Sequence, residues 1–150
     1  MGVSLVARFL VVATGGRRFA LPIAEVERAC RRVAIEPLPG APAGLLGVID
    51  VGGELWSVVD FHDRLALPPA EPSLGDRLVL LRLATMRVAI VVQAVEGVVE
   101  LGEPLASLRR VATQADEAPE ILYDLARALG LATPAPGSAP GAAGDGRATL

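Results

Sequence analysis

Two glycine pairs, each set between short apolar runs, constrain this sequence more than any other feature. Gly15-Gly16 separates "RFLVVAT" from "RRFALPI", and Gly52-Gly53 separates "LLGVIDV" from "ELWSVVD". Because glycine adopts positive φ at no steric cost, such pairs favour tight turns between antiparallel strands. The sequence therefore predicts two β-hairpins in the first half of the chain.

Short strands also dominate the second half of the chain. "DRLVLLRL", "MRVAIVVQAV" and "EGVVEL" read as three consecutive strands, and residues 33–38 as another. Pro22 suits the first turn of a helix, so "PIAEVERACRR" is expected to be helical, as are one turn in "FHDRLAL" and the segment "LARALG". Many short strands separated by turns indicate an all-β domain with short helices. The linker "PPAEPSLG" divides the strands into two groups, which predicts two small β-barrels packed together.

The composition predicts a packed domain followed by a different kind of segment. Hydrophobic residues make up 52 % of the chain and aromatic residues 3 %, so the core is expected to be aliphatic. From Thr133 onward, "TPAPGSAPGAAGDGRATL" is rich in Pro, Gly, Ala and Ser, which bury too little side-chain area to offset the entropy of ordering. We expect a folded domain over residues 1–132 and a disordered tail over 133–150.

Charge and cysteine content exclude several classes of function. The net charge is −3, which argues against a nucleic-acid partner. Cys30 is the single cysteine, so neither an internal disulfide nor a cysteine metal cluster is expected. No apolar run reaches the ~18 residues of a membrane span, and the N-terminus lacks the pattern of a signal peptide. These features predict a cytoplasmic protein that does not insert into membranes.

No group of residues has the pattern of a catalytic site, so we expect no enzymatic activity, no cofactor and no metal. Asp60 has no second acid with protease-like spacing and is expected to cap the helix in "FHDRL". His62, the single histidine, is expected to be a polar surface residue, with a pH-sensitive role as the alternative. Cys30 is expected to be a buried apolar residue. Trp56 is expected to be partly exposed at an interface, with core filling as the alternative.

The order of these pieces resembles the CheW-like domain family of bacterial chemosensory systems. The resemblance covers residues 8–131 and rests on "RFLVV", "FALPI", "AEVERA", "PLPGAP" and "GLLGVIDVGGELWSVVDFHDRL". Downstream, "RVAIVVQAVEGVVEL" and "EILYDLARAL" are similar to the family's later strands and closing helix. The resemblance implies two five-stranded β-barrels around a shared core. The first would lie mainly over residues 14–67, and the second mainly over 74–131 with the N-terminal strand added.

The resemblance also implies a non-enzymatic role. Members of the family link the cytoplasmic tip of a chemoreceptor to the regulatory domain of a CheA-type histidine kinase. The sequence departs from the family at the hairpin turn, where Gly52 replaces an arginine and Asp50 an asparagine, and also at Arg28 and Gln93, where the family has acids. Because glycine lacks the five donors of a guanidinium, the departure at Gly52 bears on receptor contact.

The positions expected to contact partners lie on the predicted helix, at the second hairpin turn and in the strand after it. They are Val26, Arg28, Arg32, Asp50, Val51, Gly52, Val58 and Val59. We expect a chemotaxis adaptor that couples a CheA-type kinase to a chemoreceptor or receptor-like partner. The alternative is a CheW-like scaffold or regulator of a non-flagellar pathway, such as type IV pili or development, with different partners.

Overall fold

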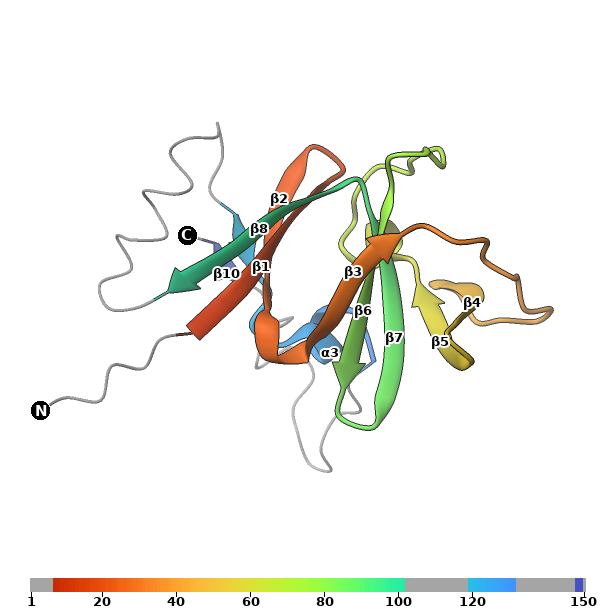
Figure 1. The fold of residues 1–150 in the computed structure, drawn as a ribbon. Coiled ribbons are helices and arrows are strands. Elements are labelled where there is room, and N and C mark those ends of the chain that lie inside the picture. Colours follow the sequence, from red (N-terminus) through yellow and green to blue (C-terminus); the bar gives the residue numbers. More distant parts are fainter. Residues whose placement is uncertain (1–6, 102–118, 132–147, 150) are drawn as a thin grey trace, which may run out of the picture.

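Two five-stranded sheets make up the protein in the computed structural model, which describes residues 7–101, 119–131 and 148–149 (Figure 1). Sheet A has the order β10-β9-β2-β1-β8 and sheet B the order β3-β6-β7-β5-β4. The strands of sheet A are β1 Ala7–Thr14, β2 Arg17–Pro22, β8 Ala94–Leu101, β9 Glu120–Ile121 and β10 Ala148–Thr149. Those of sheet B are β3 Val26–Arg31, β4 Leu45–Val51, β5 Glu54–Val59, β6 Arg77–Leu83 and β7 Met86–Val92. The helical elements are η1 Ile23–Glu25, α1 Phe61–Arg64 and α3 Leu125–Ala128.

Both glycine-pair hairpins are confirmed. Strands β1 and β2 pair antiparallel up to Thr14 opposite Arg17, across the turn at Gly15-Gly16. Strands β4 and β5 pair up to Val51 opposite Glu54, across the turn at 52–53. All four turn glycines have positive φ, which is the conformation that tight hairpin turns require.

The predicted helix over "PIAEVERACRR" is wrong. A single 3-10 turn, η1, is followed at once by strand β3, which pairs antiparallel with β6 and places Cys30 opposite Leu78. A bulge between Val26 and Arg28 shifts the register of β3, so its apolar residues recur at a spacing that imitates a helix. Residues 33–38 are likewise not a regular strand, since only Glu36 forms a bridge there, to Val48.

The expected all-β class with two five-stranded units is confirmed, but the closed barrels are not. Among the described residues, the outer strands of sheet B are β3 and β4, and those of sheet A are β8 and β10, so each sheet is open. The sheets also do not follow the ranges 14–67 and 74–131. Strand β2 lies in sheet A, and β6 and β7 lie beside β5 in sheet B.

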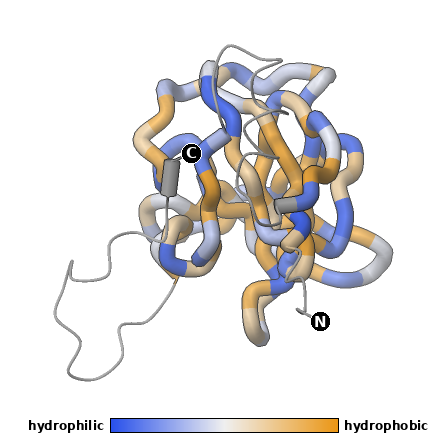
Figure 2. Tube along the Cα trace, turned by 90° about the vertical axis from the view of Figure 1, so that its left-hand side faces the viewer, coloured by the Kyte–Doolittle hydropathy of each residue, from blue (hydrophilic) through white to orange (hydrophobic). Residues whose placement is uncertain are grey.

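The largest hydrophobic cluster lies between the two sheets. Leu10, Val12 and Phe19 of sheet A pack with residues of sheet B that include Val79 and Ile90. The Phe19 ring also meets the Phe61 ring edge-on, at 5.3 Å between centroids, a favourable geometry for aromatic pairs. Figure 2 shows the apolar stretches along the chain in orange, alternating with hydrophilic ones.

A second cluster fills the other side of sheet B, and Trp56 is its largest member. Trp56 is 1 % exposed, so the expectation of a partly exposed tryptophan is wrong. Its position in β5 alternates with exposed Leu55 and Ser57, and alternate strand residues point to opposite faces. Trp56 therefore points inward with Val58, toward Leu78 and Leu80.

The predicted disordered tail over 133–150 lies outside the described residues, except for Ala148–Thr149. These two residues form β10, which pairs antiparallel with β9. In the described part of the chain, no helix has the length and apolar character needed to cross a membrane.

Candidate protein-docking surface

The turn between β4 and β5 presents backbone directly to solvent. The Asp50 carboxylate accepts a hydrogen bond of 2.8 Å from the Gly53 amide, which fixes the turn. Gly52 and Gly53 have φ of 60° and 85°. A Cβ atom added at either glycine would meet nothing within 4 Å. The turn is therefore open and has no side chain at its tip.

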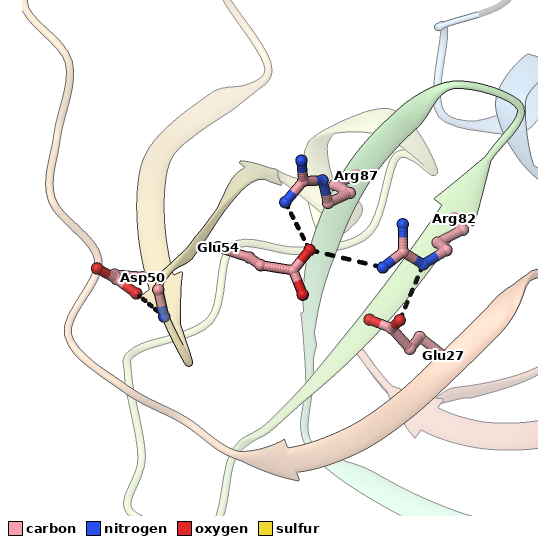
Figure 3. Close-up of polar contacts among 6 residues, drawn as sticks. Glu27, Asp50, Glu54, Arg82 and Arg87 are labelled. Carbon is pink, nitrogen blue, oxygen red and sulfur yellow. Dashed lines mark hydrogen bonds and ion pairs between the residues drawn. The ribbon is translucent and has the colours of Figure 1, made fainter.

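A network of four charged side chains borders this turn (Figure 3). Arg87 Nη1 donates to Glu54 Oε2 at 2.6 Å, and Arg82 Nη2 lies 3.6 Å from the same oxygen. Arg82 Nε also donates to Glu27 Oε1 at 2.8 Å. The hydrogen bond to Glu27, with the nearby Glu54 carboxylate, raises the pKa of the Arg82 guanidinium above its ordinary value.

These ion pairs orient the arginines more than they stabilise the fold. All four side chains are between one third and one half exposed, and exposed pairs contribute little because water and salt screen them. A shared carboxylate nevertheless limits the rotamers of both guanidinium groups. The network presents two preoriented, multidentate donors beside the hairpin turn.

An apolar groove lies next to this network, on the opposite face of β5. Leu55 is 64 % exposed and Met86 38 % exposed. Both line a groove of about 460 Å³ together with Leu45, Ser57 and Arg87 among others. Large apolar side chains exposed beside arginines are typical of the anchors of protein–protein interfaces. We call the turn, the charged network and this groove the hairpin surface; its residues are Glu27, Asp50, Gly52, Gly53, Glu54, Leu55, Arg82, Met86 and Arg87.

Among the predicted contact residues, the structure brings only three together. Asp50, Val51 and Gly52 meet at the turn, with Val51 packed partly against the cluster of Trp56. Val58 and Val59 are 0 % and 2 % exposed, so the expectation that they line a partner-facing surface is wrong. They are buried because the second cluster covers one face of β5 and the inter-sheet core covers the other.

The three predicted residues on β3 and just after it do not belong to the hairpin surface as defined above. Val26 is half-buried against the inter-sheet core, and Arg28 is exposed. Arg32 is half-buried and donates to Asp76 Oδ2 at 3.0 Å. Their contact with a partner remains a prediction.

Several residues of the hairpin surface were missed by sequence reasoning. Leu55 gave a usable signal, because its alternation with Trp56 in β5 requires that one of the two point outward. Arg82 and Arg87 gave none. Their proximity to Glu54 depends on the parallel pairing of β5 with β7 and the antiparallel pairing of β6 with β7.

The residues weighed as catalytic have structural partners instead. Asp60 caps α1, as predicted: its Oδ1 accepts from the Asp63 amide at 3.1 Å. His62 is half-buried rather than a free surface residue. Its Nδ1 donates to the Pro68 carbonyl at 2.7 Å, and its Nε2 lies 2.6 Å from Thr14 Oγ1. His62 thus ties the end of β1 to the segment after α1.

Asp60 lines a cavity of about 310 Å³. Asp63, Glu71 and Asp76 also line it. Asp76 is held by Arg32 and by the Ser73 amide, and Asp60 by its capping bond. In the described ranges, no three His, Cys, Asp or Glu side chains are grouped so that they hold a metal ion.

Three comparisons with known proteins bear on this arrangement. Residues 8–120 match the family model of the CheW-like domain. The chain is similar to "Chemotaxis protein CheW" of Rhizobium meliloti (strain 1021), at 29 % identity over 89 residues, which are 59 % of this chain and 57 % of that protein. It is also similar to "Probable chemotaxis protein CheW" of Rhizobium etli, at 25 % identity over 113 residues, 75 % of this chain and 67 % of that one. The crystal structure of the scaffolding protein TtCheW from Thermoanaerobacter tengcongensis matches with a TM-score of 0.61 at 21 % identity, over 66 % of this chain and 68 % of that chain, and this likeness shows the fold.

Proposed function

The chain belongs to the CheW-like domain family of chemotaxis scaffolds, and on this premise we propose that it is a non-enzymatic cytoplasmic adaptor. It couples the regulatory domain of a CheA-type histidine kinase to the cytoplasmic tip of a chemoreceptor or a receptor-like partner. The adaptor performs no chemistry. It acts by holding two partners in one complex through separate surfaces.

The observation that carries this proposal is the groove of the hairpin surface. Leu55 is a large apolar side chain that is 64 % exposed, on the face of β5 opposite to that of buried Trp56. Burying Leu55 and Met86 against a partner removes apolar area from water, and this is the main driving force of association. Arg87 at the edge of the groove supplies a directional polar contact. We propose that the kinase regulatory domain binds here.

The proposal is tested by titrating the full chain with the regulatory domain of its cognate kinase in a calorimeter. Leu55→Asp should weaken association by roughly tenfold or more, because it places a charge at an apolar anchor. Val98→Asp is the matched control, since Val98 is 54 % exposed on β8 of the other sheet. Absence of binding by the unsubstituted chain, or equal loss in both variants, would contradict the assignment.

The second candidate function is that of a CheW-like scaffold or regulator with a different set of partners. The turn between β4 and β5 favours this function. Gly52 offers no side chain where the family has an arginine, and the space around it is empty. Without a donor at this position, the chain lacks one polar contact to an ordinary chemoreceptor. Its partner would then be another receptor, in a non-flagellar pathway such as type IV pili or development.

Gly52→Arg separates these two candidates. The control is Gly52→Ala, which carries the same cost of a side chain at positive φ without a guanidinium. If Gly52→Arg alone gains binding to an ordinary chemoreceptor tip, the chemotaxis assignment is favoured. If neither variant binds while the kinase domain still does, the non-flagellar assignment is favoured.

A further inference from the structure

Strands β3 and β6 place two arginines directly opposite each other. Arg31 pairs with Arg77 in the antiparallel register, at the end of the ladder. Both side chains are exposed. Residues directly opposite in an antiparallel pair project on the same face at close range, and like charges in this arrangement destabilise a sheet. Repulsion between Arg31 and Arg77 therefore destabilises the end of the ladder between β3 and β6.

All the other described arginines except Arg28 have hydrogen-bond or ion-pair partners. Seven of them form ion pairs with carboxylates: Arg8, Arg17, Arg18, Arg32, Arg82, Arg87 and Arg127. Arg64 donates to the Ala43 carbonyl. Within the described part of the chain, Arg28, Arg31 and Arg77 have neither a hydrogen bond nor an ion pair, and all three belong to β3 and β6.

The acid that precedes Arg77 in sequence is not available to the pair. Asp76 is 7 % exposed. Its Oδ2 accepts from Arg32 Nη1 at 3.0 Å and from the Ser73 amide at 2.9 Å. Asp76 therefore does not neutralise the positive charge of the pair.

We propose that Arg31 and Arg77 form a recognition point for the carboxylates of an acidic segment on a protein partner. Two guanidinium groups on one face supply parallel donors, and each matches a carboxylate bidentately. Arg28 is also exposed, but it shares its face of β3 with Cys30 and not with Arg31, so the recognition point consists of Arg31 and Arg77. The proposal rests on the proposed function in taking the partner to be a protein, and it adds the chemistry by which this partner is recognised.

A phosphate polymer fits these observations less well. Nucleic-acid binding depends on neutralising many phosphates at once, commonly about six to ten for a site-specific protein. The described residues offer three unpaired arginines, and the chain as a whole carries a net charge of −3. A short acidic protein segment needs only two or three such contacts.

The test uses the full chain labelled with ¹⁵N and a hexaglutamate peptide as the probe. At low salt the peptide should shift the amide resonances around Arg31 and Arg77, and physiological salt should reduce the shifts. The double variant Arg31→Gln/Arg77→Gln should lose roughly tenfold in affinity. The control is Arg8→Gln, which removes an exposed arginine that already has a partner, Glu100. Equal losses in the control and the double variant would overturn the proposal, as would stronger shifts with a short duplex DNA at equal charge concentration.

A stability measurement gives a second, independent outcome. Arg77→Glu replaces repulsion across β3 and β6 with attraction, so the melting temperature should rise while peptide binding falls. A fall in melting temperature would show that the pair is not under strain and would contradict the argument.

The same variants separate this proposal from the proposed function. If the kinase regulatory domain and the receptor tip bind the unsubstituted chain and the double variant equally, and hexaglutamate produces no shift, the inference fails and the adaptor function stands. If hexaglutamate binds at the pair while neither protein binds, the adaptor function fails and the recognition point stands.

Discussion

The guanidinium carbon of Arg82 lies 5.5 Å from the centroid of the Trp56 ring. Arg82 also donates to Glu27, so the cation is held over the indole from one side. Trp56 is almost fully buried, and this contact joins the apolar interior of sheet B to the charged network outside it. The hairpin surface and the second hydrophobic cluster are therefore physically coupled.

The first prediction concerns Arg82→Ala. Loss of the guanidinium removes the cation–π contact and opens the ring to water, so tryptophan emission should shift to longer wavelength. Trp56 is the single tryptophan of the chain, so the fluorescence signal has one source. Arg8→Ala, on the other sheet, should leave the spectrum unchanged. An unshifted spectrum in Arg82→Ala would show that Arg82 does not shield the ring.

The second prediction concerns Trp56 as a core residue. Trp56→Ala should destabilise the protein by about 3–5 kcal/mol in urea unfolding, since it leaves a large cavity. Trp56→Phe should cost clearly less. Among the described residues the indole Nε1 has no hydrogen-bond partner, so phenylalanine loses no bond there. Equal costs for the two variants would indicate an acceptor for Nε1 that the described contacts do not include.

The third prediction concerns the cap of α1. Asp60→Ala should destabilise the protein by about 1 kcal/mol, because the Asp63 amide loses its acceptor. Asp60→Asn keeps an acceptor oxygen and should recover most of this stability. If the asparagine variant is as unstable as the alanine variant, the carboxylate charge rather than the cap is what matters.

The fourth prediction concerns Glu25, in the turn that leads from sheet A to sheet B. Burial, and secondly the charge of Asp124, raises the pKa of the Glu25 carboxyl above its ordinary value of 4.5. Between the ordinary and the raised pKa, the folded state holds a proton that the unfolded state releases. Stability from this residue is therefore complete below pH 4.5 and is lost as the pH rises through the raised value.

Glu25→Gln should accordingly raise the melting temperature at pH 7 and have little effect at pH 4. Thermal unfolding followed by circular dichroism at the two pH values measures this difference. Glu100→Gln is the control, since Glu100 is exposed and paired with Arg8. A gain at pH 4 as large as that at pH 7 would rule out a titration effect.

Local patterns in the sequence predicted local structure well. The glycine pairs identified both hairpins because positive φ is a property of single residues. The cap at Asp60 followed from its place before "FHDR" in the same way. The strand β3 escaped prediction because the bulge at Val26–Arg28 interrupts its alternation. Without that alternation, the spacing of Ile23, Val26 and Cys30 fits a helix equally well.

Features that depend on packing between distant segments could not be predicted from the sequence. Val58 and Val59 look like surface residues until sheet B is found to carry a hydrophobic cluster on each face. The Arg31–Arg77 pair and the contacts of Glu54 with two arginines depend on strand order and register. Neither strand order nor register can be inferred from the composition or the hydrophobic periodicity of a single segment.

The interleaving of the two sheets along the chain has a consequence for folding. Cutting the chain in the loop before β6 would separate β5 from β7, which are partners in one sheet, and β1 from β8, which are partners in the other. The two fragments should therefore be unstructured alone and regain shape only when mixed, so that the N- and C-terminal halves depend on each other to fold.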